Sequence, residues 1–405
     1  MKTLKDLNLK NKRVLMRADF NVPLNDKGEI EDDNRIQAAM PTIKYILEQG
    51  GSIILMSHLG RPKPEALSDS ERTLSSPKGV SKGKSKNRIE GPNSKFSLKP
   101  VAARLSELLG KPVELVTEYI DKEVPLEEGQ VVLLENIRFH KEEKENDPEF
   151  SKKLAALGDV YVNDAFGTAH WAHASTEGVA HLLPHAAGLL LEKEITTLTD
   201  VVEKPEKPVV AIIGGAKIST KIQLIKTMLD NVDAVLLGGA LANTVMLAQN
   251  HKLGKSMVEE ELAPTVKDLL SNKLRVPVDV ICAKEVKEST PTTTKAVGEI
   301  EDDDMVLDIG PDTVSLYADA ISRAKTIIWN GPMGVFEIPD FAKGTHDVAK
   351  AVANSDAYSV IGGGETAQAL KDMDMMDKVS FVSTGGGAML EFLEGKELPA
   401  IKALQ

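Results

Sequence analysis

Short runs of aliphatic and β-branched residues alternate along this chain with longer segments of helical period. Segment 35–48 shows the helical pattern, because apolar residues from Ile36 to Leu47 recur every three or four positions. Strands that alternate with helices form right-handed βαβ units and parallel sheets, so the pattern predicts an α/β protein. The expected strands are residues 12–17, 52–56, 131–134, 160–162, 209–213, 234–237, 278–282, 326–329, 358–361 and 379–383.

The number of expected strands is too large for one sheet. The chain has 405 residues, enough for two to three domains of about 150 residues each. Residues 188–203 form an amphipathic helical pattern, and Pro205 and Pro208 follow it as helix breakers. We therefore expect two doubly wound parallel-sheet domains with this helix between them.

Composition narrows the possible partners. Lys and Arg total 49 against 61 Asp and Glu, and this net charge of −12 argues against broad binding of nucleic acid or anionic membranes. The single cysteine, Cys282, excludes an intramolecular disulfide framework and a thiolate zinc cluster. The N-terminus lacks an apolar signal segment, and the apolar stretch 234–248 is too short to cross a membrane. We expect a cytoplasmic protein.

Cationic and polar residues follow the strands of the first half. They are Arg17, Asp19, Asn21, His58, Gly60, Arg61, Arg138, Asp164 and His170. The carboxyl ends of parallel strands meet at one edge of a sheet, so these residues and Arg35 are expected to lie together. The forked guanidinium group suits phosphate or carboxylate oxygens, which predicts a small anionic ligand.

Glycine clusters follow the strands of the second half. They are Gly214–Gly215, Gly238–Gly239, Asn330–Gly334, Gly362–Gly364 and Gly385–Gly387. Bare backbone N–H groups at helix starts accept anions, and five such clusters at successive strand ends favour a nucleotide site over ordinary tight turns. Lys217 and Lys221 are four residues apart, so we expect them to face the same ligand from one side of a helix.

One segment has no apolar periodicity. Residues 62–96 are rich in Ser, Pro, Gly and Lys, and residues 72–88 contain six basic residues and no acidic one. We expect a solvated insertion of disordered-type composition at about 64–95. The alternative is a polybasic arm that binds nucleic acid, a role that the overall charge disfavours.

The arrangement resembles the phosphoglycerate kinase family over nearly the full chain apart from the insertion. The motifs that carry the resemblance are RADFNVP at 17–23, SHLGRP at 57–62, DAFGTAH at 164–170, WNGPMGVFE at 329–337 and STGGGA at 383–388. The resemblance implies two Rossmann-like domains joined by a helical hinge, and a monomer. It also implies phosphoryl transfer between 1,3-bisphosphoglycerate and ADP, which gives 3-phosphoglycerate and ATP with Mg²⁺ in glycolysis and gluconeogenesis.

The resemblance gives each domain a substrate. Residues 1–187 would form the domain that binds 3-phosphoglycerate, 188–204 the interdomain helix, 205–388 the nucleotide domain, and 389–405 a segment that returns to the first domain. The implied substrate contacts are Asp19, Phe20, Asn21, Arg35, His58, Leu59, Gly60, Arg61, Arg138 and Trp171. The implied contacts to ATP or ADP are Lys217, Lys221, Gly238, Asn330, Pro332, Glu337, Gly362, Gly363, Gly364, Glu365 and Thr366. The implied catalytic residues are Arg35, Lys217, Gly363 and Gly386, and Glu365 would face Mg²⁺.

Three residues depart from the family pattern, and one of them is Ala240, which replaces a third glycine after Gly238 and Gly239. Trp171 stands where the family has an arginine that holds phosphate, and Glu365 replaces the family's aspartate. The loss of a charge-assisted contact of about 1.5–3 kcal/mol would weaken phosphoglycerate binding roughly 10- to 150-fold, unless a neighbour compensates. The alternative function is therefore a related nucleotide-binding protein with impaired 3-phosphoglycerate binding.

Overall fold

The computed structural model describes residues 1–62 and 95–405, which form two compact units. Unit 1 comprises Met1–Ile195 and Glu397–Gln405, and unit 2 comprises Thr196–Lys396. Apart from Lys95, the insertion expected at 64–95 lies outside the described residues. In residues 1–62 and 95–405, no helix has the length and apolar character needed to span a bilayer.

Unit 1 is built on a six-stranded parallel sheet with the strand order β3-β4-β2-β1-β5-β6. The strands are β1 (Arg13–Ala18), β2 (Ser52–Met56), β3 (Glu114–Val116), β4 (Val131–Leu134), β5 (Val160–Asp164) and β6 (His185–Ala187). The strand order changes direction between β1 and β5, where Ala18 pairs with Asp164. In doubly wound sheets ligands bind beside the carboxyl ends of the strands at such a switch point.

The helices of unit 1 connect these strands. They are η1 (Leu4–Asp6), α1 (Asn34–Glu48), α3 (Lys99–Leu109), η2 (Ile137–Phe139), α4 (Lys141–Lys144), α5 (Pro148–Ala155), η3 (Phe166–Thr168), η4 (Ala174–Gly178), η5 (Val179–His181) and α14 (Pro399–Lys402). Every residue of β2, β4 and β5 is buried, which explains the apolar runs at residues 53–56, 131–134 and 160–162 within them. Helix α1 buries Ile36, Met40 and Ile43 against the same core, as its periodicity predicts.

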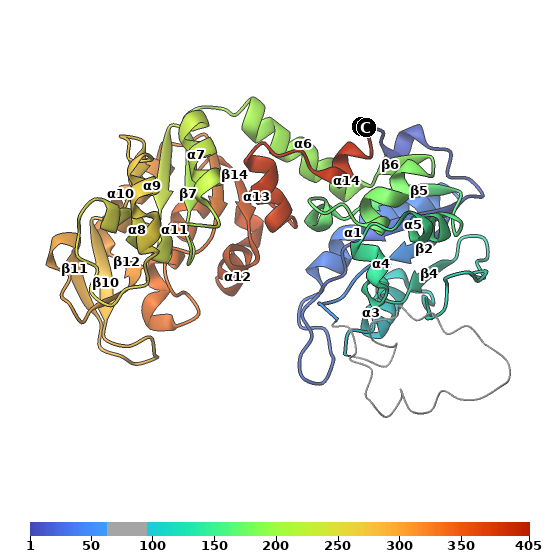
Figure 1. Ribbon diagram of the computed structural model, residues 1–405, viewed down its shortest axis with the longest axis horizontal. Coiled ribbons are helices and arrows are strands. Elements are labelled where there is room, and N and C mark those ends of the chain that lie inside the picture. The colour runs from blue at the N-terminus through green and yellow to red at the C-terminus, as the bar shows by residue number, and fades with distance from the viewer. Residues whose placement is uncertain (63–94) are drawn as a thin grey trace. The chain divides into compact units, whose positions relative to one another are not determined.

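Unit 2 has a second parallel sheet with the strand order β15-β14-β13-β7-β8-β9. The strands are β7 (Val209–Ile213), β8 (Ala234–Leu237), β9 (Leu274–Arg275), β13 (Thr326–Asn330), β14 (Tyr358–Gly362) and β15 (Phe381–Val382). Numbered along the chain within the sheet, this order is 3-2-1-4-5-6, the Rossmann arrangement, with its switch point between β7 and β13. The predicted class of two doubly wound α/β sheets is confirmed (Figure 1).

The helices of unit 2 follow the strands in the same alternation. They are α7 (Ile222–Asn231), α8 (Gly239–Ala248), η6 (Glu260–Leu262), α9 (Ala263–Lys267), η7 (Val297–Glu299), α10 (Pro311–Ser322), η8 (Pro339–Phe341), α11 (Lys343–Ala353), α12 (Gly364–Asp372), η9 (Met376–Lys378) and α13 (Gly387–Leu393). Several of them start directly after a strand, so their first N–H groups lie at the carboxyl edge of the sheet.

One expected strand belongs to a different sheet. Residues 278–282 were assigned to the parallel pattern, which is wrong, because β10 (Asp279–Ala283) pairs antiparallel with β11 (Thr293–Ala296) and β12 (Met305–Ile309). Strand β11 is mostly exposed and has the polar sequence TTKA, so it carries no apolar run that would reveal the pairing partner. This small sheet supplies one wall of a cavity described below.

Two segments connect the units in sequence. Helix α6 (Leu189–Glu203) begins in unit 1 and passes into unit 2 between Ile195 and Thr196. The carboxylate of Asp164 at the end of β5 accepts the N–H groups of Leu190 and Leu191 in the first turn of α6. The C-terminal helix α14, drawn in red in Figure 1, packs in unit 1, where the Ala400 N–H donates to the Ala169 carbonyl at 3.1 Å.

Candidate functional site

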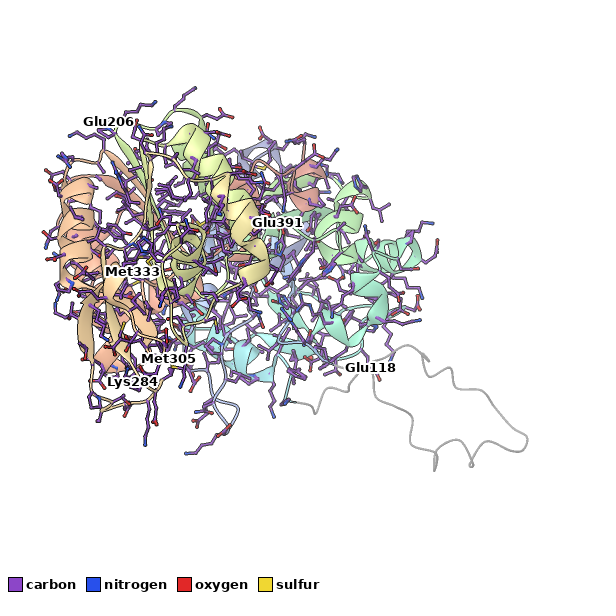
Figure 2. All side chains as sticks on the ribbon, turned by 60° about the vertical axis from the view of Figure 1, so that its left-hand side comes forward. Glu118, Glu206, Lys284, Met305, Met333 and Glu391 are labelled. Atoms are coloured by element: carbon purple, nitrogen blue, oxygen red, sulfur yellow. The ribbon has the colours of Figure 1, made fainter. Side chains whose placement is uncertain are left out.

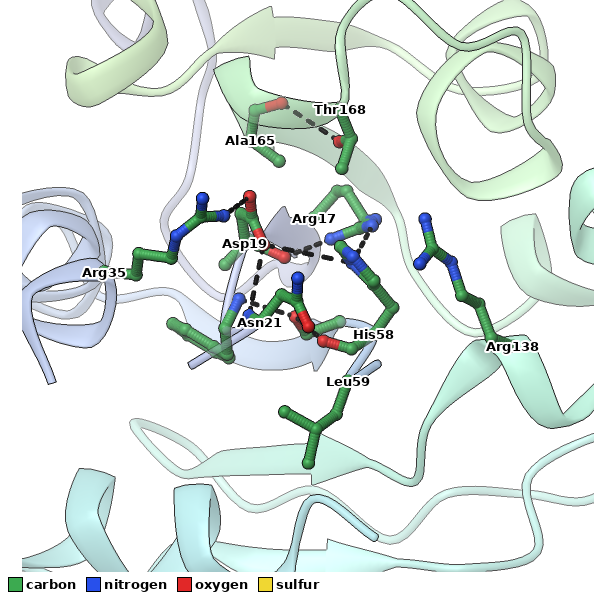
Figure 3. Close-up of polar contacts among 12 residues, drawn as sticks. Arg17, Asp19, Asn21, Arg35, His58, Leu59, Arg138, Ala165 and Thr168 are labelled. Carbon is green, nitrogen blue, oxygen red and sulfur yellow. Dashed lines mark hydrogen bonds and ion pairs between the residues drawn. The ribbon is translucent and has the colours of Figure 1, made fainter. Parts of the chain in front are cut away.

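Cationic side chains gather at the carboxyl edge of the unit 1 sheet (Figure 3). Arg35 from α1 forms an ion pair with Asp19, which lies in the loop after β1. Asp19 also has His58 beside it, with His58 Nδ1 at 3.9 Å from Asp19 Oδ1. Burial raises the pKa of Asp19, but the positive charges of Arg35 and Arg17 help to lower that pKa overall. Asp19 is therefore an anion that orients the cations around it.

His58 is a neutral hydrogen-bond donor in this cluster. Arg17 Nη2 lies 3.1 Å from His58 Nδ1, and a guanidinium group can only donate, so Nδ1 is the acceptor and the ring proton is on Nε2. Burial, together with the charges of the arginines, lowers the pKa of His58 well below its ordinary value. The ring can thus offer an N–H to a ligand without adding a positive charge.

Hydrogen bonds between side chains and the backbone hold the loops after β1 and β2 in place. Asn21 Oδ1 accepts the Gly60 N–H at 2.8 Å, and the Asn136 amide donates to the Leu59 carbonyl at 2.8 Å. Phe20 is fully buried, and its N–H donates to Ser57 Oγ at 2.8 Å. These contacts make Phe20 and Leu59 parts of the scaffold that positions the loops after β1 and β2.

Arg17 is a buried cation, and the sequence pattern does not predict its burial. Its Nε donates to Ser175 Oγ at 3.0 Å, and Ser175 in turn donates to Glu143 Oε1 at 2.6 Å. All three side chains are buried. Burial raises the pKa of Glu143, and the Arg17 charge acts against this rise. The network fixes the guanidinium next to His58. Glu143 lies in the charged run KEEK, which reads as a solvated helix face, so no sequence signal identified it.

Arg138 projects from η2 toward His58 and Arg17 (Figure 3). Its Nη1 donates to the Gly60 carbonyl at 2.9 Å, and its guanidinium lies over the ring of Trp171 at 5.0 Å from the ring centroid. Burial, followed by the charge of Arg17, lowers the pKa of Arg138 to about 10. The group is still fully cationic at neutral pH.

Arg61 completes the expected cluster at its outer side. It is exposed, and its charge is one of the causes that lower the pKa of Arg138 and of Lys144. The structure thus brings together in unit 1 all ten residues that the sequence assigned to the anionic ligand, with Phe20 and Leu59 as scaffold.

In unit 2, Lys221 lies at the switch point of the sheet. Its Nζ donates to Asn330 Oδ1 at 2.6 Å and to the Gly214 carbonyl at 2.7 Å. Burial lowers the pKa of Lys221 to about 8. Gly214 follows β7 and Asn330 ends β13, so this one cation joins the two strands between which the strand order reverses.

The expected helical alignment of Lys217 and Lys221 is wrong. Helix α7 begins at Ile222, so both lysines precede it, and Lys221 is its N-cap residue. Lys217 is exposed in the loop, where its carbonyl accepts the Thr220 hydroxyl at 2.9 Å. Gly214 and Gly215 direct the chain across the sheet edge before the helix begins, and this detour breaks the i, i+4 relation.

The glycines of unit 2 allow backbone segments to approach one another closely. A Cβ on Gly214 would lie 2.0 Å from the Pro332 carbonyl oxygen, and a Cβ on Gly238 would lie 2.6 Å from Met333 Sδ. Gly331 and Gly363 also have positive φ angles of 94° and 92°. Larger residues would push these loops apart.

Helix starts line the same edge. Gly238 precedes α8, Gly363 precedes α12, and Gly386 precedes α13, so each is an N-cap residue. Thr366 in the first turn of α12 accepts the Gly331 N–H at 2.7 Å. A Cβ on Gly362 would meet Met389 Sδ at 2.1 Å, and Gly364 has open space around it. The N–H groups at such helix starts suit phosphate oxygens.

A cavity of about 560 Å³ opens beside these loops and lies wholly within unit 2. Its walls combine apolar side chains, among them Met305, Leu307 and Met333, with the backbone of Gly215, Gly239 and Pro332. Met305 and Met333 are labelled in Figure 2. A mostly apolar cavity of this size beside anion-binding backbone fits a base attached to phosphates.

Two carboxylates lie at the rim of this cavity. Glu337 and Glu365 are both exposed and line it, and Glu365 is in the first turn of α12 close enough to Lys221 to favour its charged form. One carboxylate beside a phosphate site fits Mg²⁺, which is usually held by one or two carboxylates, water and substrate phosphates. Another acidic group in the described residues, Glu301 with Asp303 and Asp304, forms ion pairs with Lys284 and Lys295.

Known proteins resemble this chain along its whole length. The family model described as phosphoglycerate kinase matches residues 4–396. A phosphoglycerate kinase of Dictyoglomus turgidum is 49% identical over 414 residues, covering 99% of this chain and 98% of the relative. One of Chlorobium phaeovibrioides is 50% identical over 418 residues, covering 100% and 99%. The solved phosphoglycerate kinase structure from Coxiella burnetii has a TM-score of 0.86 at 43% identity over 99% of this chain and 98% of that one. The structure from Pyrococcus horikoshii has a TM-score of 0.83 at 32% identity over 100% and 98%.

Proposed function

This chain belongs to the phosphoglycerate kinase family and is a phosphotransferase, and from this premise we propose that it transfers a phosphoryl group between 1,3-bisphosphoglycerate and ADP. The products are 3-phosphoglycerate and ATP, and the reaction is reversible. The single observation that carries the proposal is the presence of two chemically different anion sites. One is the arginine cluster of unit 1, and the other is the mostly apolar cavity of unit 2 together with the helix starts beside it.

The arginine cluster is proposed to bind 3-phosphoglycerate. Arg61, which is exposed, and Arg138, which is buried, would hold the phosphate that is not transferred, because the planar set of guanidinium donors suits phosphate oxygens. Asp19, Asn21 and His58 would contact the glycerate end through its hydroxyl and carboxylate groups. The neutral Nε2–H of His58 supplies a donor there without further charge repulsion.

The cavity of unit 2 is proposed to bind ADP or ATP. The base would lie against Met305, Leu307 and Met333, and Glu337 would contact the ribose. Lys221, Asn330 and the helix starts after Gly238, Gly363 and Gly386 would bind the phosphates. Pro332, Gly362, Gly364 and Thr366 shape the backbone of this phosphate site.

Mg²⁺ is proposed to accompany the nucleotide, with Glu365 as its protein carboxylate. When bound, the ion neutralises charge on the nucleotide phosphates. Transfer of a phosphoryl group needs little covalent chemistry from the protein and much alignment and charge neutralisation. We propose that Arg35 and Lys217, with the backbone amides at Gly363 and Gly386, contact the phosphoryl group during transfer.

The alternative function is a nucleotide-binding relative that binds 3-phosphoglycerate poorly, and the observation behind it is Trp171. The complete cluster of Arg17, Arg35 and Arg138 supports the active kinase over this alternative.

A coupled assay of ADP formation from ATP tests the proposal. We expect a rate that depends on both 3-phosphoglycerate and Mg²⁺. Calorimetry separates the two functions, because normal binding of MgADP with no detectable binding of 3-phosphoglycerate would favour the alternative. An Arg138→Leu variant should lose 3-phosphoglycerate binding and keep MgADP binding. Loss of both would contradict the assignment of the two sites.

A further inference from the structure

Trp171 occupies a fixed position beside the arginine cluster. Its backbone N–H donates to the Thr168 carbonyl at 3.1 Å, and its backbone carbonyl accepts the Thr176 hydroxyl at 2.9 Å. These bonds hold the backbone on both sides of the residue and do not involve the ring. The indole therefore projects from a loop whose backbone is held by hydrogen bonds, and this loop fixes the position of the ring.

The partly buried indole ring contacts one arginine and two histidines. The guanidinium of Arg138 lies 5.0 Å from its centroid, and the ring of His173 stacks on it at 5.2 Å with an interplanar angle of 21°. His170 is also in contact, with a centroid distance of 4.4 Å. A cation within about 6 Å of the face of an indole is attracted by the electrons of the ring.

Arg138 is held from two directions. Its Nη1 donates to the Gly60 carbonyl at 2.9 Å, and its Cζ lies over the indole at 5.0 Å from the ring centroid. Figure 3 shows the guanidinium beside Arg17 and His58. The ring thus lies against the guanidinium whose Nη1 is bonded to the Gly60 carbonyl.

The charge balance of the cluster favours an aromatic residue at this position. Burial and the positive charges of Arg17 and Arg61 lower the pKa of Arg138, while the carboxylates of Glu143 and Asp19 act in the opposite direction. A further arginine at position 171 would add to the repulsion between the positive charges. An indole instead attracts the guanidinium and adds no charge.

We propose that Trp171 is a positioning residue that holds the Arg138 guanidinium against the Gly60 carbonyl. The phosphate subsite of unit 1 then works with one arginine fewer than the family pattern has. This inference rests on the proposed function, because it assigns a role within the 3-phosphoglycerate site. The indole compensates for the missing arginine by ordering the guanidinium that is present. Preorganised donors bind an anion more tightly than mobile ones.

Kinetics of three variants test the role. Trp171→Leu removes the ring, and we expect its KM for 3-phosphoglycerate to rise about 3- to 30-fold, with a much smaller change in kcat. Trp171→Phe keeps a smaller ring and should raise KM less than leucine does. Trp171→Arg exchanges the stack for a charge, so its KM should change less than about 3-fold, with a steeper dependence on salt. Tyr358→Leu, at an exposed position in β14 of unit 2, is the matched control.

Two kinetic results would overturn the proposal. One is a KM of Trp171→Leu equal to that of Tyr358→Leu. The other is a fall of 10-fold or more in the KM of Trp171→Arg, which would mean that the site lacks a charge and that the stack does not compensate.

Fluorescence tests the stack without turnover. The difference in emission between the wild-type protein and Trp171→Phe isolates Trp171 from Trp329, which is fully buried in unit 2. Arg138→Leu should change this difference spectrum, and Arg61→Leu should change it less. Equal spectra for both arginine variants would refute the stack. A wild-type protein without 3-phosphoglycerate-dependent activity would refute the proposed function, and the spectra would still decide whether Trp171 orders Arg138.

Discussion

Lys221 Nζ donates a 2.6 Å hydrogen bond to Asn330 Oδ1, a side chain 109 residues further along the chain. The two residues follow β7 and end β13, the neighbouring strands at the switch point of the unit 2 sheet. The ammonium group donates to this amide and to the Gly214 carbonyl. A phosphate group that approaches it meets a cation that is already positioned.

Removal of this cation should weaken nucleotide binding. In Lys221→Met we expect the affinity for MgADP to fall roughly 10- to 100-fold, because a charge-assisted hydrogen bond contributes about 1.5–3 kcal/mol. Isothermal titration calorimetry measures the change. Lys226→Met, an exposed lysine on α7, is the control and should bind MgADP like the wild type. Equal affinities of the two variants would contradict the assignment.

The same lysine should make nucleotide binding depend on pH. Burial lowers the pKa of Lys221 to about 8, so at pH 7 it is mostly charged and at pH 9 mostly neutral. A bound phosphate favours the charged form, and binding at pH 9 should therefore take up about one proton. Affinity should fall as the pH rises through 8. Titrations in two buffers of different ionisation enthalpy measure this uptake, which Lys221→Met should abolish.

Much of the site could be predicted from the sequence because its residues directly follow strands. The switch points at β1 and β7 collect side chains from neighbouring loops, so Arg138 and Asn330 could be assigned to the correct sheet edges. This reasoning requires only that strands are parallel, which their continuous apolar composition indicates.

The features that sequence reasoning missed depend on partners that are distant in the chain. Arg17 is charged and yet buried, because Ser175, 158 residues away, connects it to Glu143. Strand β11 was missed because its exposed polar residues gain their structure from pairing with β10. The position of Lys217 outside α7 follows from the path of the chain at Gly214 and Gly215, which no periodicity encodes.

The buried carboxyl of Asp164 should make the stability of unit 1 depend on pH. Burial raises its pKa from 3.8 to about 6, so the folded chain binds this proton more tightly than the unfolded chain does. Its contribution to stability is therefore complete below pH 4 and is lost as the pH rises through 6. In Asp164→Asn this part of the pH dependence should disappear, while Oδ1 still accepts the N–H groups of Leu190 and Leu191. Thermal unfolding of both proteins between pH 4 and 8 measures the effect, and parallel curves would refute it.

Gly331 should tolerate substitution far less well than an exposed glycine of the same unit. Its φ of 94° is strained for alanine, and an added Cβ would lie 2.3 Å from the Gly214 carbonyl oxygen. We expect Gly331→Ala to destabilise unit 2 by about 2–4 kcal/mol, which lowers its unfolding temperature by roughly 5–15 °C. Gly298→Ala, which has no neighbour within 4 Å of the added carbon, should change stability by less than about 0.5 kcal/mol. Differential scanning calorimetry compares the two.

The clash also displaces the Gly214 carbonyl that accepts from Lys221, so Gly331→Ala should bind MgADP more weakly even at temperatures where it is fully folded. Equal unfolding temperatures of the two alanine variants would mean that the loops move apart at no cost in stability, and that their close approach does not build the phosphate site.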